Sequence, residues 1–110
     1  MKTIIELDHF LAVDMRVGQV IDVVEPTWSS KLLKLTVDFG DQIGTRTIFA
    51  GLKKWYQPEV FLNQKFAFVL NLAEKKMGEE YSQGMMLVVG GKKPSIIPMP
   101  ADVELGAELC

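Results

Sequence analysis

The sequence predicts an all-β domain built as one small barrel. Residues 33–39 and 66–72 place apolar side chains at every second position, the period of a strand with one buried face. The sequence contains five apolar stretches, which are separated by segments rich in glycine or polar residues. The segment after the third stretch favours a helical turn. Five short antiparallel strands in this order fit a Greek-key barrel of the OB type, whose closure removes exposed strand edges. An SH3-like barrel and a half-open sandwich are the alternatives.

The first two strands form the clearest part of this pattern. Residues 16–24, RVGQVIDVV, are rich in β-branched side chains and predict a long strand. Gly18 lies where the alternation shifts register, so we expect a bulge there. Residues 31–39, KLLKLTVDF, predict the second strand, because leucine, valine and phenylalanine alternate with polar side chains.

The remaining strands follow from turns and breaks in the pattern. Residues 40–44, GDQIG, predict a turn into a third strand at residues 45–50. Pro58 interrupts the next segment, which we expect to be a short helix between strands three and four. Residues 66–72 and 84–90 predict strands four and five, with a loop between them.

The barrel takes up about residues 16–90 of a single domain, 1–110, and leaves apolar N- and C-terminal extensions. Residues 7–14, LDHFLAVD, predict a short helix capped by Asp8. We expect its apolar side chains to face inward, namely Phe10, Leu11 and Val13. The proline-containing tail after residue 93 predicts extended chain. Apolar flanks on so small a domain favour dimer contacts, so we expect a homodimer.

The composition excludes several classes of protein and site. The chain has 110 residues, is 48% hydrophobic and contains one cysteine, so neither an intrachain disulfide nor a multi-cysteine metal site can form. No apolar run approaches the roughly 20 residues of a membrane span, and acidic residues interrupt the N-terminus, so we expect a cytoplasmic protein. With a single histidine and no nucleophile or phosphate-loop motif, the sequence predicts neither catalysis nor a cofactor or metal.

The charges are distributed unevenly along the chain. The whole chain carries −2, but residues 31–76 hold eight of its twelve basic residues and only four of its fourteen acidic ones. That segment is therefore net positive although the protein is net acidic. The net acidic balance argues against an indiscriminate polycation and leaves two interpretations of the lysines open: one localised basic face, or an ordinary solvated surface.

The middle of the chain also contains the residue types that bind nucleic acid. In an OB barrel these strands and loops hold oligonucleotides. Lysine and arginine neutralise phosphate, amides and hydroxyls bond to sugar or base edges, and a methionine lies against a base or ribose. Scarce aromatic residues on this face favour a folded RNA over generic single strands. We predict RNA contacts, gathered on one face, from Lys31, Lys34, Arg46, Asn71, Lys75, Lys76, Ser82, Gln83 and Met85.

Several short motifs, taken in order, carry a family resemblance. VDMRVGQV, Lys31-Leu32, VDFG, AGL at residues 50–52, NL at 71–72 and SQGM at 82–85 together resemble a tRNA-binding domain. That domain is appended to methionyl-tRNA synthetases, to phenylalanyl-tRNA synthetase beta subunits and to a multisynthetase cofactor, and also occurs as a free-standing dimer.

The resemblance implies an OB-fold protein that binds tRNA by shape at its outer corner, with little dependence on base sequence. It also implies a homodimer and an aminoacyl-tRNA synthetase partner, in cis or in trans. The positions that match the family's RNA-binding motifs are Lys31, Arg46, Asn71, Lys76, Ser82 and Met85. Lys34, Lys53, Lys54 and Lys75 are electrostatic additions.

This sequence departs from the family pattern beside the expected site. GEEYSQGM has one more residue than the commonest form, and Glu79 and Glu80 would repel phosphate unless they point away. A sister branch of the same fold is an export-related chaperone that binds unfolded polypeptides. Chaperone activity is therefore the alternative function.

Overall fold

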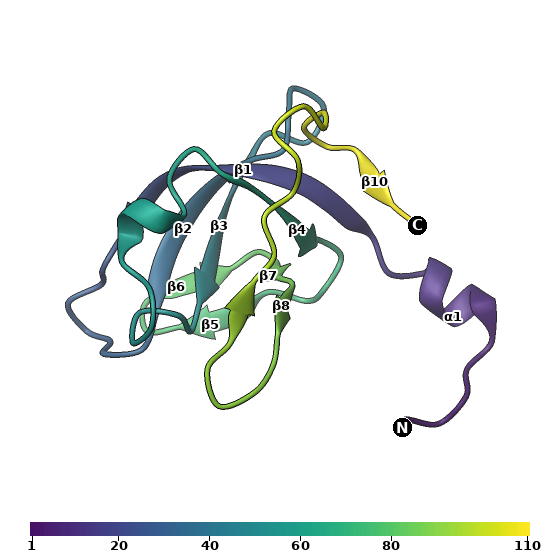
Figure 1. Cartoon of the computed structure of the whole chain (residues 1–110), viewed down its shortest axis with the longest axis horizontal. Coiled ribbons are helices and arrows are strands. Elements are labelled where there is room, and N and C mark those ends of the chain that lie inside the picture. The colour runs from purple at the N-terminus through teal and green to yellow at the C-terminus, as the bar shows by residue number, and fades with distance from the viewer.

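A computed structural model describes residues 1–110, and its main sheet confirms the predicted OB-type all-β fold. The antiparallel strand order is β3-β2-β1-β4-β7, and β10 adds to β1. β1 is the longest strand and curves over the others in Figure 1, pairing with β4 through its first half and with β2 through its second. The strands of this sheet are β1 (Met15–Val24), β2 (Leu33–Asp38), β3 (Thr45–Ala50), β4 (Lys65–Val69), β7 (Met85–Met86) and β10 (Glu108–Leu109).

Side chains that alternate along the strands fill the barrel. In β2, Leu33, Leu35 and Val37 are fully buried, and the residues between them are partly exposed. The connection between β3 and β4 contains the predicted short helix as a single turn, η1 (Pro58–Val60). Four aromatic rings are the largest buried side chains, namely Phe39, Phe61, Phe66 and Phe68.

The bulge in β1 lies further along the strand than the sequence predicted. The register against β2 shifts between Val20 and Asp22, not at Gly18. A glycine is required at position 18 for a different reason: a Cβ there would come within 2.5 Å of Val37 and 2.6 Å of Phe39, so no larger residue fits. The glycine therefore lets β1 pass close over the core.

Two predictions for the region after β4 need correction. The expected loop contains a hairpin formed by β5 (Lys75–Met77) and β6 (Glu80–Ser82), with Gly78 at positive φ in its turn. The expected fifth strand at residues 84–90 divides into β7 and β8 (Val88–Val89), because the chain changes partner from β4 to β9 (Ser95–Ile96).

The N-terminal helix, α1 (Leu7–Leu11), lies apart from the barrel in Figure 1. It begins after Glu6 with no side-chain cap, so the predicted cap at Asp8 is wrong. It buries no residue, and the expectation that Phe10, Leu11 and Val13 face inward is also wrong. No helix of the protein has the length and apolar character required to cross a membrane.

Candidate nucleic-acid interface

Two of the predicted RNA contacts close the barrel. The Ser82 hydroxyl accepts a hydrogen bond from the backbone N–H of Phe49 at 3.0 Å and donates one to the carbonyl of Gly84 at 3.1 Å. The side-chain carbonyl of Gln83 accepts from the N–H of Thr47 at 2.9 Å, and the N–H of Gln83 donates to the carbonyl of Thr47. Ser82 is only 5% exposed. Ser82 and Gln83 therefore satisfy the backbone of β3 at its otherwise open edge.

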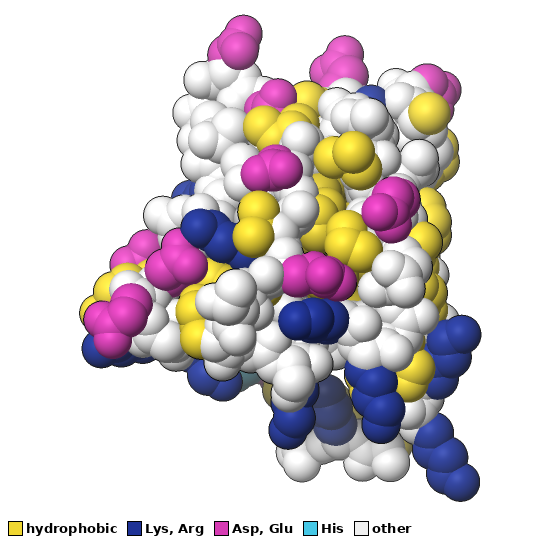
Figure 2. All heavy atoms as spheres, turned by 90° about the vertical axis from the view of Figure 1, so that its left-hand side faces the viewer, with side chains coloured by type: hydrophobic (Ala, Val, Ile, Leu, Met, Phe, Trp, Pro, Cys, Tyr) yellow, Lys and Arg dark blue, Asp and Glu magenta, His cyan; other side chains and the backbone are white.

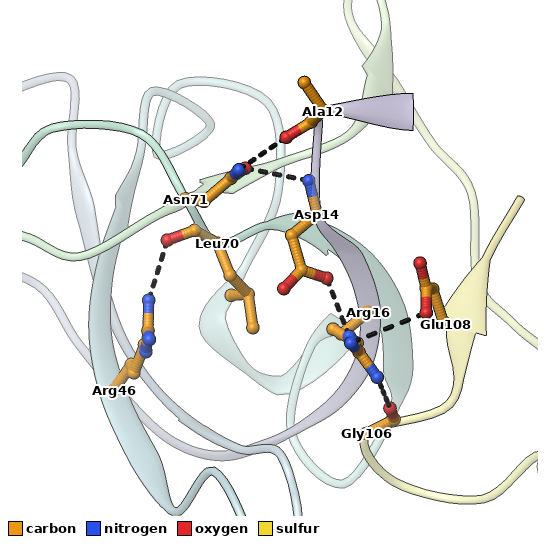
Figure 3. A network of polar contacts seen from close by, with 8 residues as sticks. All are labelled: Ala12, Asp14, Arg16, Arg46, Leu70, Asn71, Gly106 and Glu108. Carbon is orange, nitrogen blue, oxygen red and sulfur yellow. Dashed lines mark hydrogen bonds and ion pairs between the residues drawn. The ribbon is translucent and has the colours of Figure 1, made fainter. Parts of the chain in front are cut away.

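Arg46 and Asn71 also make structural contacts, at one end of the barrel (Figure 3). Arg46 Nη1 donates to the carbonyls of Leu70, at 2.8 Å, and Gln83, at 3.2 Å. The Asn71 amide accepts from the N–H of Asp14 at 2.8 Å and donates to the carbonyl of Ala12 at 2.6 Å. Arg46 thus links β3 to the end of β4, and Asn71 fixes the segment that leads to α1.

The hollow beside these two residues contains charges of both signs. It has a volume of about 390 Å³, and Asp14, Arg16, Asp41 and Arg46 are among its lining residues. Arg16 pairs with Asp14 at 2.7 Å and with Glu108 at 3.5 Å (Figure 3). Its hydrogen bond to Asp14 raises the pKa of Arg16 above its ordinary value, because the carboxylate stabilises the charged guanidinium. With two carboxylates in its lining, this end of the barrel is a poor match for a polyanion.

The prediction that all these side chains share one face is wrong. In the β2–β3 pairing, Lys34 lies opposite Phe49, whereas Arg46 lies opposite Val37. These positions fall on opposite faces, because successive side chains alternate along a strand. Val37 is buried, so Arg46 belongs to the inner face and Lys34 to the outer one.

The β5–β6 hairpin separates the predicted lysines further. Lys34 Nζ forms an ion pair with Glu80 of β6 at 2.5 Å. Lys75 pairs with Ser82, and Lys76 pairs with Tyr81. Because neighbouring residues face opposite sides of a hairpin, Lys75 lies on the side of buried Ser82, and Lys76 points the other way with exposed Tyr81.

Three neighbouring hollows lie along β3, β7 and the segment that follows β3. The first and second share Phe49 and Met85, and the second and third share Gly51. The first is also lined by Leu72, Lys75 and Met77, the second by Leu52, Met86, Val88 and Pro94, and the third by Lys31, Lys54 and Trp55. We refer to these residues together as the groove.

Lysines supply the only formal charges in the lining of the groove. Lys75 lies at one end, Lys31 and Lys54 lie at the other, and no carboxylate lines any of the three hollows. Lys93 precedes Pro94, which lines the second hollow, and its Nζ lies 5.5 Å from the centre of the Tyr56 ring. In Figure 2, Lys and Arg side chains gather over the lower part of the molecule, and Asp and Glu side chains are prominent over the upper part. The groove thus combines apolar walls with a positive rim.

The sequence predicted lysines at both ends of the groove and one residue of its walls, but missed the other wall residues of the first hollow. Lys31, Lys75 and Met85 were predicted as contacts, whereas Leu72 and Met77 were not. Leu72 continues the alternation of β4, which predicts a core residue, yet it is exposed. Trp28 packs behind the first hollow: its ring lies 5.7 Å from that of Phe49, and a Cβ on Gly78 would come within 3.1 Å of the Trp28 ring. Trp28 therefore packs between the barrel and the turn of the β5–β6 hairpin.

Comparison with known sequences assigns the chain to a family. Residues 15–108 match the family described as "Putative tRNA binding domain". The chain belongs to this family. The match contains both the residues that close the barrel and the whole groove.

Relatives of known name agree with this assignment. The chain is 39% identical over 106 residues to a methionine–tRNA ligase of Pyrococcus abyssi, covering 96% of this chain and 14% of that protein. A methionine–tRNA ligase of Methanococcus aeolicus is 35% identical over 107 residues, with 97% and 16% covered. The chain therefore spans about one seventh of the length of these enzymes.

Solved structures show the same fold. A MetRS related protein from Pyrococcus horikoshii matches with a TM-score of 0.93 and 35% identity, over 99% of this chain and 100% of that one. The chaperone CsaA from Picrophilus torridus matches with a TM-score of 0.87 and 26% identity, over 97% and 100%. The fold is thus shared by a protein described as related to MetRS and by one described as a chaperone.

Proposed function

We propose that this protein binds tRNA through the groove, with little dependence on base sequence and without catalysing a reaction. The observation that supports this most directly is the set of lysines Lys31, Lys54 and Lys75 around a groove with no carboxylate in its lining. Such a surface can attract the phosphates of an RNA although the whole protein is acidic.

The chemistry of the groove supports sequence tolerance. Base identity is recognised by hydrogen bonds to base edges. Apart from lysine ammonium groups, the side chains that line the three hollows offer only the Ser82 hydroxyl and the Trp55 N–H. The hydroxyl already bonds to Phe49 and Gly84. Few groups are left to distinguish one base from another.

We further propose that the protein acts as a homodimer that contacts its partner copy through the N-terminal segment. The apolar residues of this segment, Ile4, Ile5, Leu7, Phe10 and Leu11, are all exposed. A five-residue helix is not stable by itself in water. A second copy of the chain would bury this surface and stabilise α1.

The relatives suggest where such binding acts. Because the chain matches one segment of methionine–tRNA ligases, we propose that it helps a synthetase of this kind to hold its tRNA, in cis or in trans. RNA binding through surface lysines requires no cofactor or metal, which fits an auxiliary role.

Two neighbouring lysines provide a direct test. Lys75→Ala is expected to weaken tRNA binding about threefold to tenfold in a filter-binding assay, because it removes a cation from the groove. Lys76→Ala is the matched control, since it removes the same charge from the opposite side of the same hairpin. Equal losses from both variants would show that general charge, and not the groove, determines binding.

The alternative is capture of unfolded polypeptide, which the apolar walls and the likeness to the CsaA structure support. Salt distinguishes the two functions. RNA binding weakens steeply as the salt concentration rises, because the counterions that the protein displaces from the phosphates gain less entropy in a more concentrated salt solution. Apolar capture is nearly insensitive to salt or strengthens with it.

A further inference from the structure

We propose that the first hollow of the groove receives an unpaired base of the bound RNA, with Lys75 close to the adjoining phosphate. This inference rests on the proposed function and specifies what the RNA must offer: a single-stranded loop, bulge or end, not a fully paired helix. It concerns the hollow formed by Phe49, Leu72, Lys75, Met77 and Met85.

The walls of this hollow present apolar surface to solvent. Leu72 is 49% exposed and Met85 is 47% exposed, although they lie in the same hollow. Phe49 is buried and Met77 is half-buried, so they provide its floor and side. The volume of about 420 Å³ lies within the roughly 300–1,000 Å³ typical of small-molecule sites.

These walls match a base better than a sugar-phosphate backbone. Phosphate and ribose would cover Leu72 and Met85 without making a favourable contact. The face of a base is flat and weakly polar, and it gains from contact with a methionine or leucine side chain. A paired helix keeps its bases stacked, whereas an unpaired nucleotide can turn its base outward.

Charge complementarity selects a nucleotide over an apolar peptide. Lys75 belongs to the same hollow, and its neighbour Ser82 is buried with its hydroxyl already bonded. A base in the hollow leaves its own phosphate outside, close to a cation. An apolar peptide side chain would pack against the walls of the hollow but would leave the Lys75 ammonium without an anionic partner.

The test compares two RNAs with the same number of phosphates, using the full chain. One is a hairpin with 2-aminopurine in an unpaired loop, and the other is a blunt, fully paired duplex. The hairpin is expected to bind about fivefold or more tightly, with a change in 2-aminopurine fluorescence. Met85→Ala and Leu72→Ala should each weaken hairpin binding about threefold to tenfold, without changing its salt dependence or the affinity for the duplex.

Leu62→Ala is the control, since Leu62 is comparably exposed, at 41%, and lies outside the groove. Equal affinities for the two RNAs, unaffected by either groove variant, would overturn the base site and leave tRNA binding intact. A carboxymethylated, unfolded polypeptide is the third probe. If Met85→Ala and Leu72→Ala reduced only its binding, the hollow would be a peptide site. Whole tRNA is measured beside these probes, and if the unmodified protein did not bind tRNA, the proposed function itself would fail.

Discussion

Ser82 is the residue whose expected role changes most. As a hydroxyl among the predicted RNA contacts it looks like a ligand for ribose, but it is buried and completes the hydrogen bonding of β3 and Gly84. Spacing alone could not reveal this, because the partner of Ser82 is the backbone N–H of Phe49, 33 residues away. The Ser82 hydroxyl thus supplies the acceptor that a neighbouring strand would otherwise offer to β3.

Ser82→Ala should destabilise the barrel by about 1–3 kcal/mol, because it leaves the buried N–H of Phe49 without an acceptor. Urea denaturation followed by tryptophan fluorescence measures this change. Ser30→Ala is the control, since Ser30 is exposed. A variant with unchanged stability and lost tRNA binding would show that the hydroxyl contacts RNA directly.

Glu80 limits the basic character of the outer face. Its ion pair with Lys34 holds that lysine beside a carboxylate, where a phosphate would have to compete. Both partners are partly exposed, so the pair itself contributes little to stability.

Glu80→Gln is therefore expected to strengthen tRNA binding about twofold to fivefold, because it frees Lys34. Glu79→Gln removes the same charge from the adjacent residue, which forms no ion pair. Fluorescence anisotropy with labelled tRNA compares the two variants. Equal gains would attribute the effect to net charge and not to Lys34.

Among the elements, the strands were easier to predict than their connections. β2 follows directly from its period of two, because one of its faces is buried throughout. The β5–β6 hairpin could not be predicted in this way, since its short strands carry charged residues and pack through Trp28 and Ser82. α1 was predicted correctly in position but not in orientation, because no periodicity shows whether an apolar side chain meets its own barrel or another copy.

The α1 helix provides a test of the proposed dimer. Leu7→Asp combined with Leu11→Asp should convert the protein to a monomer in light scattering, because both side chains are exposed on a helix that buries nothing in its own chain. The thermal melt of the barrel should change little for the same reason. A dimer that persists in this variant would place the contact elsewhere.

In the whole molecule, the folding of the barrel places basic residues that are close in the sequence on different faces. Residues 31–76 suggested one basic face, but β2 and β3 direct Lys34 and Arg46 to opposite sides, and Arg46 lies near Asp14 and Asp41. The lysines that line the groove belong to three separate segments, with Lys75 at one end and Lys31 and Lys54 at the other. Family membership, the OB-type fold and some of the residues that line the groove were therefore within reach of the sequence, whereas the groove itself depends on tertiary pairing.

The salt dependence of tRNA binding tests the central claim, that these three lysines bind phosphate at the groove. For the unmodified protein, the logarithm of the association constant should fall against the logarithm of salt concentration with a slope of about −2 or steeper. The triple variant Lys31→Ala, Lys54→Ala and Lys75→Ala should lose about two units of that slope. A slope near zero for the unmodified protein, or one that the triple variant leaves unchanged, would contradict the account.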